Sequence, residues 1–422
     1  MAIYLDVSAA VHGRAGLGRY AASLARALVD VAANRFALFY NRDRETSLPA
    51  GLEHLPSRSV HAGYKPWRMA VWLGHLAKVG FNRLVPDAEL FHATEHLLLP
   101  LRSVPTVLTV HDLIFHLFPE HHKPLNYWYL NLALPLYCRR ATAIIAVSEA
   151  SKRDLVRCWG LDPARITVVH EAADPRFRPA SPAEIATVRR RYNLPPRFLV
   201  TVGVIEPRKN LSRLLDALAI LRRDDDVRLV IVGGKGWLTA EFFGKLESFA
   251  HRQAVTLTGY VPDADLPAMY NAATVCVQPS LYEGFGLPLL EAMACGVPVV
   301  CSRASSFPEV GGDAARYFDP GNVEEMAEAI RYLWRDEALR AEMHGRGLAQ
   351  ATHFSWARAA RETVAVYERV LGRGSEREMP AGEFALSEAG AELLKEDSDG
   401  KSLSSQTRCT GRVRGPGRTR KR

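Results

Sequence analysis

Residues 274 to 298 show how this chain folds: TVCVQPSLYEGFGLPLLEAMACGVP. Thr274–Gln278 is an apolar run typical of a buried strand, and a glycine-rich turn follows it. A helix then begins with Pro288 in its first turn. Proline suits this position because a backbone N–H there would have no acceptor within the helix. The helix is expected to end at Gly296, because glycine suits the left-handed residue after a helix. Strand, turn and helix in this order predict one unit of an α/β sheet.

The same alternation of strand-like and helix-like segments continues on both sides of this stretch. Leu17–Ala33, for example, has the apolar period of a helix. Continuous apolar strands separated by helices are typical of a parallel sheet covered on both faces, which is a doubly wound α/β domain. The expected strands are Ile3–Val7, Phe36–Tyr40, Leu90–His92, Thr106–Val110, Ala143–Val147, Ile166–Val169, Phe198–Gly203, Leu229–Val232, Val255–Thr258, Thr274–Gln278, Pro298–Cys301 and Arg316–Phe318.

Prolines interrupt the alternation near the middle of the chain. Five of them lie between residues 174 and 197, a density that favours a linker. The last strong helix, Trp356–Val370, has no strand after it and is expected to cross back to the first domain. The sequence therefore predicts an N-terminal Rossmann-like domain over residues 1–178, a linker over 179–197, a second such domain over 198–372, and a disordered basic tail over 373–422.

Composition and length exclude several classes of protein. A chain of 422 residues with 48% hydrophobic and 24% charged residues is long enough for two to three globular domains. The best apolar run, Trp128–Cys138, is broken by Asn131 and Pro135, so no membrane span is expected. No basic residues precede Ile3–Val7, as they would precede the apolar run of a signal peptide. These features predict a cytoplasmic protein.

Cysteines and charge add two further expectations. The six cysteines are scattered without a C-x-x-C pair, so reduced thiols are expected and a zinc site is not. The net charge of +8 is concentrated in Arg408–Arg422, which has seven basic residues and no acidic one. Such a tail is more often a solvated end or a surface anchor than a segment that binds nucleic acid, so we expect no nucleic-acid partner.

A first candidate site is the glycine-rich turn at Gly16 and Gly18, between a predicted strand and a helix. Glycine lets the backbone approach an anion closely, and a helix N-terminus favours a phosphate. Gly16-x-Gly18-x-x-Ala21 also fits the dinucleotide fingerprint, with Asp43 as the ribose ligand of an NAD-dependent oxidoreductase. A tight turn without a ligand is the simpler alternative.

A second candidate site follows Gly203, where Arg208 and Lys209 stand at the start of the next helix. Cations at a helix N-terminus oppose the helix dipole, so another charge must offset their cost. A bound diphosphate would do this. A solvated basic loop is the alternative.

The third candidate site is the turn quoted first. Glu291 lies in the first helical turns and Glu283 in the glycine-rich turn, so both carboxylates are expected to face one cleft. Carboxylates accept hydrogen bonds from sugar and ribose hydroxyls, and the amides of Gly284, Phe285 and Gly286 are expected to hold phosphate. Since all three turns follow strand C-termini, where open α/β sheets bind ligands, they predict a site for a nucleoside diphosphate sugar.

These motifs together resemble the retaining glycosyltransferases of family 4, which have the GT-B fold of two Rossmann-like domains facing a cleft. The resemblance covers roughly residues 2–371, and a stretch of the second half is similar to the mannosyltransferase branch. It is carried by Glu283 and Glu291 with seven residues between them, Glu206-Pro207-Arg208-Lys209-Asn210, Thr258-Gly259-Tyr260-Val261-Pro262, Leu266–Tyr270, Ser305–Ala315, the Gly16–Gly18 turn, Val110-His111-Asp112 and Val147-Ser148.

The resemblance implies a role for each matching residue. Many members carry an arginine where this chain has Val204, so Arg208 is expected to supply that charge. Base choice is expected to depend on the backbone near Tyr260 and Val261. The implied donor-binding residues are Gly16, Gly18, Arg208, Lys209, Tyr260, Val261, Gly284, Phe285, Gly286 and Glu291 (ribose), and the implied catalytic residues are Glu283 (transferred sugar) and His111 (sugar–acceptor junction).

The resemblance further implies transfer with retention of anomeric configuration and without a metal or other cofactor. Three D-x-D matches, at residues 224–226, 263–265 and 397–399, are discounted as a charged loop, a helix cap and part of the tail. The expected reaction moves mannose from GDP-mannose to a glycan or lipid-linked oligosaccharide. A UDP- or ADP-sugar donor, an oxidoreductase, a glycoside hydrolase and a non-enzymatic basic membrane protein remain alternatives. The aromatic and basic stretch Tyr64–Leu84 either contacts lipid or faces the core.

Overall fold

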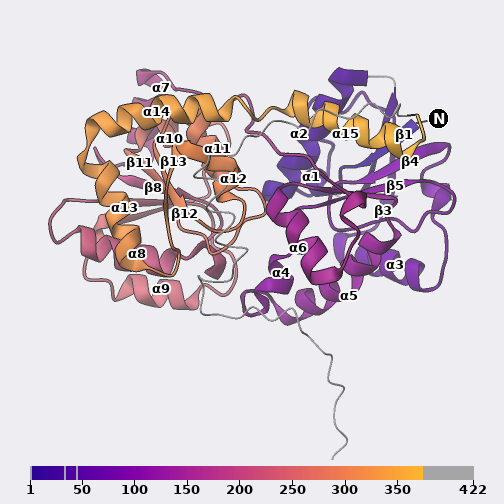
Figure 1. Cartoon of the computed structure of the whole chain (residues 1–422), viewed down its shortest axis with the longest axis horizontal. Coiled ribbons are helices and arrows are strands. Elements are labelled where there is room, and N and C mark those ends of the chain that lie inside the picture. The colour runs from indigo at the N-terminus through magenta and orange to yellow at the C-terminus, as the bar shows by residue number, and fades with distance from the viewer. Residues whose placement is uncertain (1, 33–34, 44–45, 374–422) are drawn as a thin grey trace, which may run out of the picture.

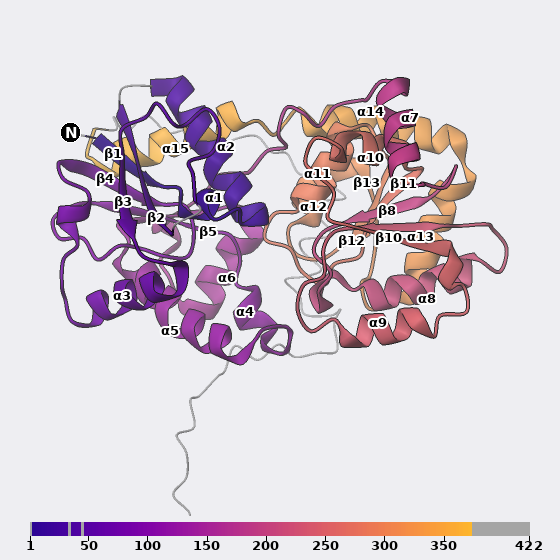
Figure 2. The same cartoon turned by 180° about the vertical axis from the view of Figure 1, so that it is seen from behind.

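The computed structural model describes residues 2–32, 35–43 and 46–373 (Figure 1). Within them the strands form two fully parallel sheets, each covered by helices on both faces, and the two lobes stand side by side (Figure 2). The first sheet has seven strands in the order β3-β2-β1-β4-β5-β6-β7, and the second has six in the order β10-β9-β8-β11-β12-β13. The predicted α/β fold with two doubly wound units is confirmed.

The first sheet and the helices around it form what we call the N-terminal domain. Strand β5 is buried along its whole length because helices cover both faces, which explains why its sequence is continuously apolar. The strands are β1 (Ala2–Asp6), β2 (Phe36–Arg42), β3 (Ser57–His61), β4 (Ala88–Ala93), β5 (Thr106–Val110), β6 (Ala143–Ala146) and β7 (Ile166–Val168), and the helices are α1 (Ser8–Val11), α2 (Ala15–Ala32), α3 (Tyr64–Leu76), α4 (Ile114–Leu117), α5 (Pro124–Arg140) and α6 (Glu149–Trp159).

The second sheet forms the C-terminal domain in the same way. Strands β8, β9, β11 and β12 are buried throughout. The strands are β8 (Leu199–Val202), β9 (Leu229–Val232), β10 (Val255–Gly259), β11 (Val275–Gln278), β12 (Val299–Ser302) and β13 (Ala315–Phe318), and the helices are α8 (Leu211–Leu221), α9 (Ala240–Glu247), α10 (Leu266–Ala272), α11 (Leu287–Ala294), α12 (Phe307–Gly311), α13 (Val323–Arg335) and α14 (Glu337–Ala351).

Every strand predicted from the sequence is present, with its ends shifted by at most two residues. Strand β3 was not expected. It is an edge strand paired only to β2, and none of its residues is buried, so it needs no apolar pattern. The quoted stretch folds as predicted, with Pro288 in the first turn of α11 and Gly296 at a positive φ of 71° after it.

The proline-rich segment between the domains is more ordered than a plain linker. It contains α7 (Pro182–Arg191), whose N-terminus has a capping box between Ser181 and Glu184. The pattern Ser-x-x-Glu before the helix was readable in the sequence, but the surrounding prolines masked it.

Helix α15 (Trp356–Val370) leaves the C-terminal domain and packs against α2 of the N-terminal domain (Figures 1 and 2). Tyr367 hydrogen-bonds His92 of β4 at 2.6 Å, and Glu368 pairs with Arg35 at 2.5 Å. This helix therefore ties the two lobes together at one edge. The predicted tail lies outside the described residues, except for Arg373.

Across the described part of the chain, no helix is both long and apolar enough to cross a bilayer.

Candidate active site

A cavity of about 510 Å³ lies between the two domains. Gly18 and Arg19 of α2 line it from the N-terminal side, and Glu291 of α11 lines it from the C-terminal side. Tyr260, which follows β10, also lines it and is 75% exposed, whereas Val261 is buried beside it. The structure thus brings three of the predicted donor-binding residues, Gly18, Tyr260 and Glu291, to one cavity.

Arg19 joins the two walls of this cavity. Its Nη1 lies 2.8 Å from Glu291 Oε1 and its Nη2 lies 2.8 Å from Asp263 Oδ1. Tyr270 donates a hydrogen bond to the other oxygen of Glu291 at 3.0 Å. Sequence reasoning assigned no role to Arg19 and assigned Asp263 to a helix cap, because the sequence does not show which side chains meet across a domain interface.

Burial raises the pKa of Glu291 above its ordinary value, although Arg19 and Tyr270 oppose this effect. A raised pKa means that keeping this carboxylate ionised costs free energy. A ligand that donates hydrogen bonds from its hydroxyls would lower that cost. The side chain is therefore suited to accept hydrogen bonds from a sugar or ribose entering the cavity.

Glu283 makes a different set of contacts. Lys209 Nζ lies 2.7 Å from its Oε1, and Arg208 Nη1 lies 2.7 Å from its Oε2. Burial alone would raise the pKa of Glu283, but the two cations outweigh burial and lower it to about 2. All three side chains are largely buried, so the alternative of a solvated basic loop is wrong.

The negative charge that was expected to offset Arg208 and Lys209 therefore comes from the chain itself, from Glu283. Arg208 also pairs with Glu206, and these acids raise its pKa even though burial lowers it. Glu291 lines the interdomain cavity, and Glu283 is not among the residues that line it. That both carboxylates face one ligand stays a prediction.

The glycine-rich turn at the start of α2 also differs from its prediction. The Gly18 amide donates to the carbonyl oxygen of Arg14 at 2.5 Å, so it is not free for a phosphate. A Cβ on Gly18 would lie 2.8 Å from the Ala9 carbonyl oxygen, so glycine is needed for close packing of α2 on α1. Gly16, in the first turn of α2, does not line the cavity, although Ala15 beside it does.

The turn before α11 contacts the N-terminal domain directly. In the described structure, the amides of Gly284, Phe285 and Gly286 have no intramolecular acceptor, and phosphate binding by them stays a prediction. A Cβ on Gly284 would lie 2.4 Å from the His111 carbonyl oxygen, so only glycine permits this contact. Ser148 Oγ donates to the Gly284 carbonyl at 2.6 Å from the other side.

His111 is buried with both ring nitrogens engaged. Nδ1 lies 3.1 Å from Glu171 Oε1, and Nε2 lies 2.9 Å from the Thr94 carbonyl oxygen. Burial lowers the pKa of His111, but the hydrogen bond and charge of Glu171, the Thr94 carbonyl and the charge of Asp112 together outweigh burial and raise the pKa. Two acceptors face the two ring nitrogens at the end of β5, an arrangement that favours the protonated ring. The His111 ring does not line the interdomain cavity.

Glu309 makes another contact between the domains that the sequence did not reveal. It accepts hydrogen bonds from the Glu149 amide, at the start of α6, at 2.9 and 3.0 Å. Its Oε1 also lies 2.5 Å from His170 Nε2. A carboxylate of one domain thus satisfies the helix N-terminus of the other.

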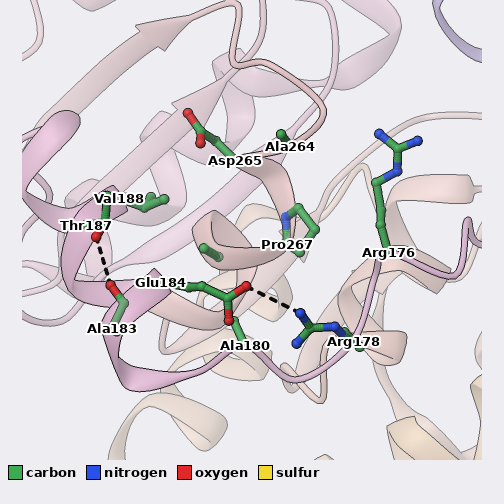
Figure 3. Close-up of a pocket in the computed structure, with 11 residues that line it drawn as sticks. Arg176, Arg178, Ala180, Ala183, Glu184, Thr187, Val188, Ala264, Asp265 and Pro267 are labelled. Carbon is green, nitrogen blue, oxygen red and sulfur yellow. Dashed lines mark hydrogen bonds and ion pairs between the residues drawn. The ribbon is translucent and has the colours of Figure 1, made fainter.

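A second cavity of about 440 Å³ lies beside α7 and α10 (Figure 3). Arg176, Arg178 and Asp265 line it, and it includes none of the predicted site residues. Asp265 occupies the position before α10, but its carboxylate caps no amide and binds Arg191 and Tyr192 instead, so the predicted helix cap is wrong. Among the described residues, no cluster of three or more potential metal ligands is found.

Comparison with known proteins identifies the family. The model described as Glycosyltransferase Family 4 matches residues 14–177, and the model described as Glycosyl transferases group 1 matches residues 185–349. The chain is 37% identical over 273 residues to O-antigen chain mannosyltransferase B of Escherichia coli, covering 64% of this chain and 72% of that protein. The chain belongs to glycosyltransferase family 4.

Other relatives of this glycosyltransferase agree with that result. The serotype-specific mannosyltransferase WbdA of Escherichia coli is 32% identical over 296 residues, which cover 68% of this chain but only 36% of that longer protein. Among solved structures, Anabaena HepE in complex with UDP and glucose has a TM-score of 0.67 at 22% identity, covering 87% of this chain and 99% of that one. This likeness supports the GT-B fold.

Membership in the family excludes the oxidoreductase, glycoside hydrolase and non-enzymatic alternatives. Within the dinucleotide fingerprint, Gly18 serves instead the close packing of α2 on α1, whereas a Cβ on Gly16 would meet nothing within 4 Å. Asp43, its expected ribose ligand, does not line the interdomain cavity.

The charge state of Glu283 makes a testable prediction about stability. A carboxyl whose pKa falls from 4.5 to about 2 on folding stabilises the fold above pH 4.5 and loses this effect as the pH falls toward 2. The contribution is on the order of 3 kcal/mol. Urea unfolding between pH 6 and pH 3 should show a steeper loss of stability in the wild type than in Glu283→Gln.

Glu342→Gln is the matched control, since Glu342 makes an exposed ion pair with Arg346 on α14. Its pH dependence should follow that of the wild type. Equal slopes for the wild type and Glu283→Gln would show that Glu283 is not held as a buried carboxylate.

Proposed function

We propose that this glycosyltransferase moves mannose, with retention, from GDP-mannose to a hydroxyl of a glycan or lipid-linked oligosaccharide. The observation that carries the proposal is the cavity between the domains, where Arg19 and Glu291 from opposite lobes meet. Mannose is favoured because the Escherichia coli relatives that match this chain are mannosyltransferases by name. UDP remains the alternative nucleotide, since HepE binds UDP.

The donor would be held by both domains. Glu291 would accept hydrogen bonds from the ribose hydroxyls, which requires Arg19 to release it. The freed Arg19 would then lie beside the diphosphate, together with the free amides of Gly284 to Gly286. Arg208 and Lys209 would share their charge between Glu283 and the diphosphate.

The chemical step needs stabilisation of negative charge above all. As the bond between the anomeric carbon and the diphosphate oxygen breaks, negative charge develops on the leaving nucleoside diphosphate. Fixed cations and amides aimed at that charge lower the barrier, each donor by about 2.7–4 kcal/mol. We propose that Lys209 and Arg208 supply this charge, so that the scheme needs no metal.

The acceptor hydroxyl would attack from the side that the leaving group departs, which retains the anomeric configuration. Its oxygen bonds to the anomeric carbon, and its proton passes to a phosphate oxygen of the leaving group. Glu283 would position the transferred sugar through its hydroxyls, because a carboxylate with a pKa of about 2 is a poor proton acceptor. His111, which is buried and held by Glu171, would serve by shaping the acceptor side. We expect this reaction to take place in the cytoplasm.

The choice of donor can be tested by thermal unfolding with GDP, UDP and ADP sugars. A ligand that binds only the folded protein raises its Tm, and at about 100 times Kd the gain is about 2.7 kcal/mol. GDP-mannose should give the largest rise in Tm, and mannose transfer should be seen with that donor.

NAD serves as the control and should leave the Tm unchanged. A larger rise with UDP-glucose than with GDP-mannose would overturn the mannose assignment while leaving the glycosyltransferase assignment intact.

The role of Glu291 is tested with a nucleotide that lacks the hydroxyls it would bind. In calorimetric titrations, the wild type should bind 2′,3′-dideoxy-GDP about tenfold to hundredfold more weakly than GDP, since hydrogen bonds to a charged group contribute about 1.5–3 kcal/mol. Glu291→Gln should bind GDP more weakly and lose most of this discrimination. If the variant discriminates as strongly as the wild type, the ribose lies elsewhere.

A further inference from the structure

Half of the large apolar side chains that the described structure exposes gather on two helices of the N-terminal domain, α3 and α5. Those that are more than half exposed are Leu73 and Leu76 on α3, and Leu125, Trp128 and Leu132 on α5. The spacings of three and four residues place each set on one helical face. An exposed apolar surface of this kind marks an interaction site more often than it occurs by chance.

The two helices lie side by side (Figures 1 and 2). Arg68 stacks on the Tyr129 ring at 3.9 Å and hydrogen-bonds Asn126, and Trp72 meets the same Tyr129 ring at 6.5 Å. Further along, Arg140 donates to His75 at 2.8 Å. The two stripes therefore form one continuous surface, which we call the α3–α5 face.

The charges on this face have a single sign. Neither helix contains an acidic residue. Exposed Lys65 and Lys123 stand at the N-terminal ends of the two helices, and exposed Lys78, Arg139 and Arg140 stand at their C-terminal ends. Glu120, which precedes α5, is the acidic side chain nearest to it along the chain.

We propose that the α3–α5 face docks on an anionic lipid bilayer. Leucine and tryptophan side chains would enter the boundary of the acyl chains, and the cations at both ends would meet the negative headgroups. The basic residues 408–422 of this chain are a poor occupant for the face, because like charges repel. A nucleic acid would be attracted by the cations but would leave the leucines exposed.

The position of the face gives it a consequence for catalysis. Tyr64, the first residue of α3, lies under the guanidinium of Arg14 at 3.9 Å, and Arg14 lines the interdomain cavity. The N-terminal end of α3 is therefore linked through Arg14 to the N-terminal wall of that cavity. This consequence rests on the proposed function, whereas lipid binding itself does not.

The test uses the full chain with vesicles of phosphatidylcholine and phosphatidylglycerol. The wild type should float with these vesicles, and lipids brominated in their acyl chains should quench Trp128. Trp128→Phe should remove most of the quenching, although six other tryptophans remain. A combined Leu73→Ser, Leu76→Ser and Leu132→Ser variant should bind at least tenfold more weakly.

Val31→Ser with Tyr332→Ser is the matched control, because both side chains are exposed apolar residues on other helices, α2 and α13. This control should bind vesicles like the wild type. The proposal is overturned if the wild type binds without quenching of Trp128, or if the leucine variant folds and binds unchanged. It is also overturned if light scattering shows a stable dimer that buries Trp128.

Discussion

Arg19 and Glu291 stand 2.8 Å apart although they belong to different domains, and the proposed site depends on this contact. Each residue follows the C-terminal end of a central strand in its own parallel sheet, β1 for Arg19 and β11 for Glu291. Such strand ends are where open α/β sheets bind ligands. Because the two edges face each other, one cavity receives side chains from both, and a ligand too large for one domain can be held between them.

The two glutamates of the motif differ in what surrounds them. Glu283 is neutralised by Lys209 and Arg208, and its pKa is lowered to about 2. Glu291 pairs with Arg19, which also pairs with Asp263. Burial raises the pKa of Glu291. A permanently charged carboxylate suits the orientation of a sugar near developing positive charge. In the proposed reaction, Arg19 would release Glu291 when the ligand binds, which suits a ligand that arrives and departs.

Sequence patterns predicted most of the fold because burial on both faces gives strands such as β8 and β11 continuous apolar runs. The solvent-exposed edge strand β3 lacks that signal, and α7 was hidden among prolines. The pairing of Glu283 with Lys209 could not be predicted, because local spacing does not show which charges meet over 74 residues. The same holds for Arg19, Asp263 and the contact of Glu309 with α6.

The central claim is that both domains hold one nucleotide sugar. A crystal structure of the complex with GDP tests it most directly. The account predicts ribose hydroxyls within hydrogen-bond distance of Glu291, Arg19 turned from Glu291 toward the diphosphate, and Lys209 on the opposite side of that diphosphate. A nucleotide bound to the C-terminal domain alone, with the Arg19–Glu291 ion pair still intact, would contradict it.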